Sequence, residues 1–160
     1  MTDYRSVLAA LAEAKVRFIV VGGAAATAHG ASRLTQDIDI VYARDAENVR
    51  NLVEALRPHQ PYPRGAPPGL PFIWDERTIA NGLNFTLTTT LGDIDLLGEI
   101  TGGGDFEDLL SDGVALTIFG HSCLCLGLRK LIAVKRAAGR PKDFEAIAEL
   151  ELILAATESE

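Results

Sequence analysis

The stretch GGAAATAHGASRLTQDIDIV, residues 22–41, combines two adjacent glycines, an alanine-rich segment and two aspartates separated by one isoleucine. Apolar residues flank it, because FIVV precedes the glycines and IVY follows the second aspartate. Aspartate is a poor strand former and is costly to bury. Asp37 and Asp39, placed in what otherwise reads as a core strand, therefore point to a function rather than to packing.

Hydrophobic periodicity predicts the elements around this stretch. Residues 58–71 hold six of the seven prolines and are expected to form an irregular loop that serves a site or an interface. The order of elements predicts an α+β fold (an α/β sandwich), with a mixed β-sheet and flanking helices, in a single domain of residues 1–160. The expected helices cover residues 3–15, 24–29, 46–57, 105–110, 128–138 and 141–155, and the expected strands cover residues 17–21, 37–42, 84–90, 93–98, 114–119 and 122–126.

Charge and composition narrow the classes of partner. Fifteen Lys and Arg against 22 Asp and Glu leave a net charge of −7, which disfavours general binding to nucleic acid. The charge is uneven, since residues 127–142 contain six basic side chains and no acid, and residues 143–160 contain six acids and no base. No long apolar run and no signal-peptide pattern occurs, so we expect a cytoplasmic protein without a membrane partner.

The aspartates form a repeated pattern. Side chains alternate across a strand, so Asp37 and Asp39 share one face while the isoleucines between and after them share the other. The segment GDIDLL repeats the arrangement with Asp93 and Asp95. If the two strands are neighbours, three or four carboxylates converge and repel one another. A divalent cation removes that repulsion, and Mg²⁺ favours carboxylates together with substrate phosphates.

Other residues of the sequence suit a bound phosphate. The Gly22-Gly23 pair lies between a strand and a helix, where the backbone can approach a ligand closely and helical N–H groups face an anion. Arg33 could supply a further phosphate contact, although a surface role is nearly as consistent with its position. Lys135 continues an apolar helix stripe, so it either extends its charge to solvent or meets a phosphate. Together these residues predict a nucleoside triphosphate as ligand.

Several residues outside this group have simpler interpretations. His121, Cys123 and Cys125 alternate on one strand, but no fourth ligand accompanies them, so we do not expect a transition-metal site. Trp74 is more typical of a core residue than of a base-stacking platform. We likewise expect a structural role for His29 and a solvated side chain for Asp93. Asp143 lies in the first turn of an expected helix, where an acid complements the helix dipole without a catalytic role.

The sequence resembles the nucleotidyltransferase fold of the DNA polymerase beta superfamily. In that superfamily a glycine pair, commonly Gly-Ser, opens a helix, a D-x-D follows on the next strand, and a third acid lies on a later strand. Here GG, thirteen intervening residues, DID and GDIDLL match this order. The segments GGAAATAHGASRLTQDIDI, DLLGEITG and LIAVKRAAGRPKD are most similar to small stand-alone bacterial nucleotidyltransferases, which are related to AbiEii-type toxins and to minimal nucleotidyltransferases of toxin–antitoxin pairs.

The resemblance implies a role for each matched residue. Asp37 and Asp39 would bind two Mg²⁺ ions, and Asp95 would share the metal and help to deprotonate an acceptor hydroxyl. Lys135, and Lys142 together with Asp143, would correspond to the late lysine and the K-D element of the family. One departure is that Gly23 stands where the superfamily usually has a serine that contacts the terminal phosphates.

The expected function is therefore Mg²⁺-dependent transfer of a nucleoside monophosphate from an NTP to a hydroxyl acceptor with release of pyrophosphate. The acceptor could be RNA such as tRNA, a protein or a small molecule, and the resemblance adds a cognate toxin or antitoxin, or a role in phage defence. One alternative is a non-catalytic nucleotidyltransferase-like antitoxin or nucleotide-binding module. A metal-dependent phosphohydrolase would use the same acids.

Overall fold

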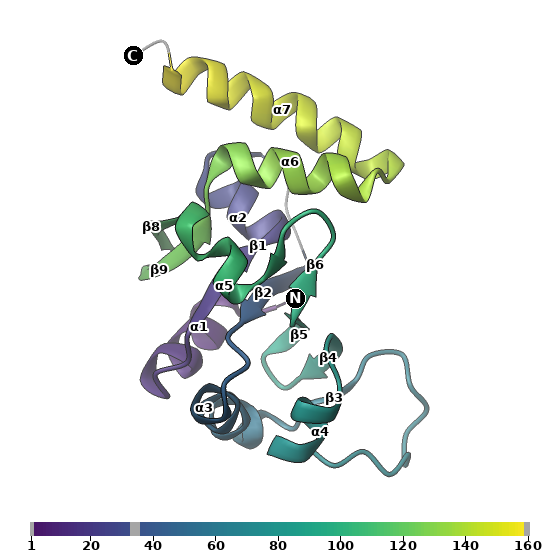
Figure 1. Ribbon diagram of the computed structural model, residues 1–160. Helices are drawn as coiled ribbons and strands as arrows, with labels where there is room; N and C mark the ends of the chain where they lie inside the picture. The colour runs from purple at the N-terminus through teal and green to yellow at the C-terminus, as the bar shows by residue number, and fades with distance from the viewer. Residues whose placement is uncertain (1, 33–35, 159–160) are drawn as a thin grey trace.

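A mixed β-sheet forms the centre of the computed structural model, which describes residues 2–32 and 36–158 (Figure 1). Within these residues the main sheet has seven strands in the order β3-β4-β5-β2-β1-β9-β8, and a second sheet pairs β6 with β7. The strands are β1 (Phe18–Val21), β2 (Asp37–Tyr42), β3 (Tyr62–Pro63), β4 (Phe85–Thr89), β5 (Gly92–Leu97), β6 (Glu99–Ile100), β7 (Gly104–Asp105), β8 (Gly113–Ile118) and β9 (His121–Leu126).

Helices pack around this sheet. In Figure 1, α6 and α7 lie together above α2, while α1 and α3 lie toward the opposite end of the molecule. In the described part of the chain the helices are α1 (Tyr4–Glu13), α2 (Gly22–Ala28), α3 (Ala46–Leu56), α4 (Glu76–Asn81), α5 (Phe106–Leu109), α6 (Leu128–Ala138) and α7 (Pro141–Glu158), and the 3-10 turns are η1 (Arg57–His59) and η2 (Leu110–Asp112). The predicted α+β class with a mixed sheet is thus confirmed.

Local sequence signals explain several of these boundaries. Asp45 caps α3, because its side chain accepts a hydrogen bond from the backbone N–H of Asn48. Gly139 ends α6 in the left-handed conformation, with φ of 64°, that glycine adopts at helix ends. Pro141 then opens α7 at a first-turn position, where a missing N–H costs nothing.

The pairing of β2 with β5 is the contact that positions the site. These strands are parallel neighbours, and their isoleucines and leucine on one face are fully buried: Ile38, Ile40, Ile94 and Leu96 each have 0% exposure. Burial of each such side chain contributes roughly 2 kcal/mol relative to exposure. This apolar face holds the two strands together and offsets the repulsion among the acids on the other face.

The proline-rich segment differs from the sequence-based expectation. The prediction of a wholly irregular loop at residues 58–71 is wrong, because Arg57–His59 forms a 3-10 turn and Tyr62–Pro63 forms strand β3 on β4. A proline is tolerated there because β3 is the edge of the sheet, where one side of the strand needs no N–H donor. The segment thereby extends the sheet next to the acid-bearing strand pair.

Candidate active site

The two D-I-D segments lie in matched register. Asp37 pairs with Asp93 and Asp39 with Asp95 across β2 and β5, so all four carboxylates project from one face. Carboxylate oxygens of Asp37, Asp39 and Asp95 lie within 4.8 Å of one another, and all three side chains are half-buried. The convergence expected from the sequence is therefore present, with Asp93 beside the group rather than in it.

Asp39 is the electrostatic centre of this group. The pKa of Asp39 is raised to about 8, first by burial and then by a hydrogen bond with Asp95 and the charges of Asp37 and Asp95, while Lys135 opposes the rise. The Oδ1 atoms of Asp39 and Asp95 are buried and have no hydrogen-bond partner among the described residues. Three converging carboxylates at this spacing offer the oxygen ligands that Mg²⁺ takes, so the residues present fit a divalent cation.

Gly22 is required by its contact with Asp39. The two residues are neighbours in space, because Val21, which directly precedes Gly22, pairs with Asp39 between strands β1 and β2. A Cβ atom at position 22 would lie 2.1 Å from Oδ2 of Asp39, and Gly22 has a φ of 64°, which side-chain-bearing residues rarely adopt. The start of α2 therefore lies directly against the acid group, as the phosphate-turn hypothesis for Gly22-Gly23 requires.

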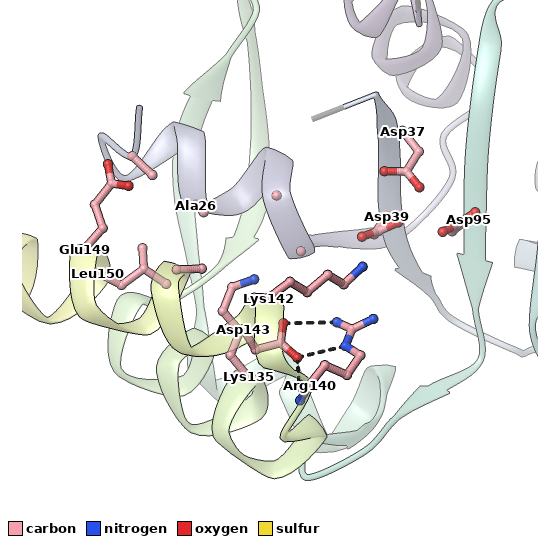
Figure 2. Close-up of a pocket in the computed structure, with 14 residues that line it drawn as sticks. Ala26, Asp37, Asp39, Asp95, Lys135, Arg140, Lys142, Asp143, Glu149 and Leu150 are labelled. Atoms are coloured by element: carbon pink, nitrogen blue, oxygen red, sulfur yellow. Dashed lines mark hydrogen bonds and ion pairs between the residues drawn. The ribbon is translucent and has the colours of Figure 1, made fainter. Parts of the chain in front are cut away.

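A cavity of about 230 Å³ adjoins the acids (Figure 2). Figure 2 shows Arg140 and Lys142 extending from the junction of α6 and α7 toward the carboxylates. The cavity thus has an acidic wall and a cationic wall, which is the charge distribution that metal-bound phosphates need. It is lined by Gly22, Gly23, Ala26, Ala31, Asp37, Asp39, Asp95, Lys135, Arg140, Lys142, Asp143, Ala146, Glu149 and Leu150.

The cationic wall is held by Asp143, which is 2% exposed. Its Oδ2 accepts hydrogen bonds from Nε of Arg140 at 2.8 Å and from the Arg140 backbone N–H at 3.2 Å, while Oδ1 accepts from Nη2 at 3.2 Å. These bonds lower the pKa of Asp143. Its first-turn position was expected, whereas its part in orienting Arg140 toward the cavity was not.

Lys135 lies where the acidic and cationic walls meet. Its side chain is half-buried in the last turn of α6 and lines the cavity. Burial lowers the pKa of Lys135, while Asp143 and Asp39 oppose that shift. Of the two interpretations left open by the sequence, contact with an anionic ligand accords better with this position than extension into bulk solvent does.

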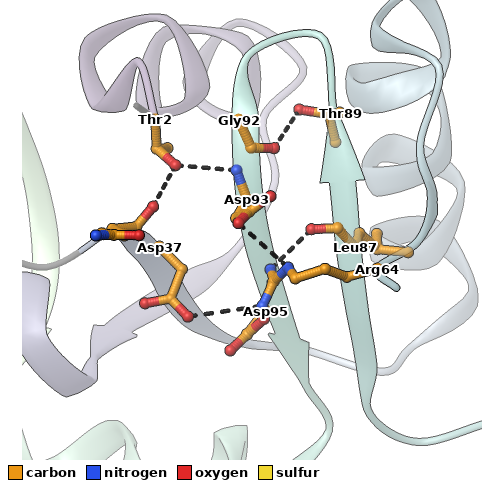
Figure 3. A network of polar contacts seen from close by, with 9 residues as sticks. Thr2, Asp37, Arg64, Leu87, Thr89, Gly92, Asp93 and Asp95 are labelled. Carbon is orange, nitrogen blue, oxygen red and sulfur yellow. Dashed lines mark hydrogen bonds and ion pairs between the residues drawn. The ribbon is translucent and has the colours of Figure 1, made fainter. Parts of the chain in front are cut away.

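Arg64 was not expected at the site. Its guanidinium lies beside three of the four carboxylates, with Nη2 2.8 Å from Oδ1 of Asp95, Nε 3.4 Å from Oδ2 of Asp93 and Nη1 3.7 Å from Oδ2 of Asp37 (Figure 3). Asp93, for which a solvated side chain is expected, is 38% exposed and in addition pairs with Arg64. The available signal was that Arg64 is the sole Lys or Arg in residues 58–71.

Thr2 ties the ends of the two acid-bearing strands together. Its hydroxyl donates to the carbonyl of Gln36 at 2.5 Å and accepts from the N–H of Asp93 at 2.9 Å (Figure 3). Thr2 is 6% exposed, so these bonds are shielded from water. The N-terminal segment thereby supports the register that brings Asp37 beside Asp93.

The remaining candidates lie elsewhere. Arg33 falls outside the described residues. His29 ends α2, where its Nε2 lies 2.9 Å from the carbonyl of Leu126, and Trp74 is buried and donates from Nε1 to the carbonyl of Val53 at 2.9 Å. Cys123 and Cys125 are free thiols, and they belong to no metal-binding group among the described residues. Burial of Trp74 agrees with the expected core position.

Comparison with known proteins identifies the fold. No family profile and no curated protein sequence matches this chain. Among solved structures, the lincosamide antibiotic adenylyltransferase LnuA bound to lincomycin has a TM-score of 0.63 at 15% identity, covering 94% of this chain and 96% of that one. The antibiotic-resistance factor ANT(2'')-Ia has a TM-score of 0.56 at 17% identity, with coverage of 98% and 89%.

A nucleotidyltransferase-like protein from Paracoccidioides brasiliensis has a TM-score of 0.54 at 15% identity, covering 92% of this chain and 74% of that one. At these identities the likeness establishes the fold alone, which is the nucleotidyltransferase fold that the sequence resembles. None of the described helices has both the length and the apolar character needed to span a membrane.

Proposed function

We propose that this protein is a Mg²⁺-dependent nucleotidyltransferase that moves a nucleoside monophosphate from an NTP to a hydroxyl acceptor. The observation that carries the proposal is the convergence of Asp37, Asp39 and Asp95 opposite Gly22 and a cationic wall. The nucleotidyltransferase fold of the chain supports the same chemistry.

The triphosphate would lie between the two walls of the cavity. Lys135, Arg140 and Lys142 would neutralise its oxygens, and the backbone at Gly22-Gly23 would approach it closely because no side chain intervenes. In phosphoryl transfer, positioning and charge neutralisation provide most of the catalysis. The cationic residues and the glycine turn would therefore orient the α-phosphorus toward the acceptor.

The three aspartates would hold Mg²⁺, with two ions expected from the family resemblance. When bound, the metal polarises phosphate oxygens and neutralises the charge that develops on them. The raised pKa of Asp39 means that a metal would compete with a proton for this carboxylate near neutral pH. Asp95 would accept the proton of the acceptor hydroxyl as its oxygen bonds to the α-phosphorus, and the bond from that phosphorus to the bridging oxygen breaks to release pyrophosphate.

Transfer of an α-phosphate label tests the proposal. Purified protein is incubated with α-labelled ATP, CTP, GTP or UTP, Mg²⁺ and separate acceptors: tRNA, protein, an aminoglycoside and a lincosamide. We expect labelled acceptor and free pyrophosphate from the wild type, and no label transfer from Asp95→Asn. The matched control is Asp112→Asn, which removes one exposed carboxylate outside the cavity and should leave transfer unchanged.

Other product patterns would contradict the proposal in distinct ways. Metal-dependent NTP binding without any product would favour the nucleotide-binding module. Release of inorganic phosphate or free nucleotide with no labelled acceptor would favour the phosphohydrolase.

Small antibiotics are included because LnuA is a lincosamide antibiotic adenylyltransferase and ANT(2'')-Ia forms a complex with adenylyl-2''-tobramycin. A toxin–antitoxin or phage-defence role stays a prediction from the sequence resemblance.

A further inference from the structure

The proposed metal site already contains a cation that belongs to the protein. Arg64 projects from the edge of the sheet into the acid-bearing face and lies within 4 Å of Asp37, Asp93 and Asp95 (Figure 3). We propose that Arg64 is the resident counterion of the metal-free site and is displaced when a divalent cation binds. This inference rests on the proposed metal site, and it assigns to Arg64 the control of that site's affinity.

The contacts of Arg64 are those of a substitute ligand. Nη2 lies 2.8 Å from Oδ1 of Asp95, a buried carboxylate oxygen that has no hydrogen-bond partner among the described residues. Within the same part of the chain, the Nε atom of Arg64 is also buried without a hydrogen-bond partner. The guanidinium thus supplies charge at short range without completing the hydrogen bonds of either partner. Such an arrangement is weaker than a well-formed Arg–carboxylate fork and is easier to replace.

A metal ion and this guanidinium compete for the same space and charge. Mg²⁺ must lie about 2.1 Å from an oxygen that it binds. A cation at that distance from Oδ1 of Asp95 would lie close to Nη2 of Arg64, and two positive charges only a few ångströms apart repel strongly in a half-buried site. Divalent binding through Oδ1 of Asp95 therefore requires the side chain of Arg64 to withdraw.

The backbone around Arg64 allows this movement without loss of the fold. The backbone N–H of Arg64 donates to the carbonyl of Thr86 at 3.0 Å, which fixes the main chain on β4. The next residue, Gly65, has a φ of 79°, and a Cβ atom added there would have no neighbouring atom within 4 Å, so the chain beside Arg64 is loosely packed. The side chain is 27% exposed and can rotate toward solvent. This rotation breaks the hydrogen bond that Nη2 donates to the carbonyl of Leu87.

Metal affinity measured without nucleotide tests the inference. Binding of Mn²⁺ is followed by electron paramagnetic resonance for the wild type, Arg64→Gln, Arg64→Lys and the control Arg50→Gln. Arg50 is an exposed arginine of α3 that pairs with Glu76, so its substitution removes the same charge away from the acids. We expect Arg64→Gln to bind Mn²⁺ roughly tenfold more tightly, because the metal no longer has to displace the ion pairs between Arg64 and the aspartates.

The two other variants separate the effect of a side chain placed among the acids from the effect of the protein's net charge. Arg64→Lys keeps the charge but lacks the planar fork that reaches three carboxylates, so we expect an intermediate affinity. Arg50→Gln should match the wild type. An Arg64→Gln protein that is folded by circular dichroism and binds Mn²⁺ no more tightly than the wild type would overturn the inference, because Arg64 would then only orient the acids.

The outcomes also distinguish this inference from the proposed function. If Arg64→Gln binds Mn²⁺ more tightly but no acceptor is labelled, displacement of Arg64 stands and nucleotidyl transfer fails. If neither the wild type nor Arg64→Gln binds Mn²⁺, the inference and the metal site fail together.

Discussion

Replacement of Asp39 by asparagine tests the electrostatics of the acid group directly. Burial, a hydrogen bond with Asp95 and the charges of Asp37 and Asp95 raise the pKa of Asp39 from 3.8 to about 8. The folded, metal-free protein therefore keeps a proton that the unfolded chain releases above pH 4. The free energy of unfolding must therefore fall as pH rises from about 4 to about 8, because the folded state binds more protons than the unfolded state over that range.

The size of the effect follows from the same shift. One fully displaced proton changes the free energy of unfolding by about 1.4 kcal/mol per pH unit. Partial solvent access and proton sharing with Asp95 reduce this figure, so we expect about 1 kcal/mol per unit, or about 2 kcal/mol between pH 5 and pH 7. Asparagine has nearly the same shape and no charge. In Asp39→Asn this part of the pH dependence should be absent, and near pH 7.5 the variant should be the more stable protein.

Urea denaturation in EDTA at pH 5, 6, 7 and 8 measures this difference. Trp74 is the single tryptophan and is buried, so its fluorescence reports unfolding. The quantity of interest is the difference between wild type and Asp39→Asn at each pH, because groups common to both proteins cancel. Asp112→Asn serves as the control and should follow the wild type. Parallel stability profiles for wild type and Asp39→Asn would refute the assignment of a raised pKa to Asp39.

Three further predictions concern the metal, the glycine turn and the core. Mg²⁺ should raise the melting temperature of the wild type more at pH 8 than at pH 6, because binding displaces the Asp39 proton. This difference between the two pH values should vanish in Asp39→Asn. Equal increases at both pH values in the wild type would contradict the linkage. Gly22→Ser should lose NTP binding and destabilise the fold by about 2 kcal/mol or more, because the new Cβ meets Asp39 and φ at this position is positive. At Gly23 φ is not positive, so Gly23→Ser should be tolerated and should bind NTP roughly tenfold more tightly in calorimetry. If both serine variants behave alike, the assignment of the turn is wrong. Ile94→Ala should lower the free energy of unfolding by about 2–5 kcal/mol in urea melts, because it empties a fully buried position behind the acids, and a loss below about 1 kcal/mol would show that the two strands do not depend on this face.

The sequence alone determined the parts of the site that depend on local chain geometry. The alternation of acid and isoleucine assigned Asp37 and Asp39 to one face and their apolar neighbours to the other, because successive side chains of a strand point in opposite directions. The same rule applied to Asp93 and Asp95. Glycine at position 22 and the basic segment before α7 were also readable, since they depend on residue type and short-range spacing.

Tertiary structure decided what these residues meet. The parallel pairing of β2 with β5, which sets Asp39 opposite Asp95, joins segments far apart in the chain, and no local pattern specifies which strands become neighbours. The raised pKa of Asp39 likewise requires the burial and neighbours that only the assembled sheet provides. Arg64 is the clearest case, because its proline-rich surroundings predicted a loop while strand pairing at the sheet edge carried its guanidinium to the acids. Local periodicity encodes the direction of a side chain, whereas the charges it faces are set by long-range packing of the apolar face behind it.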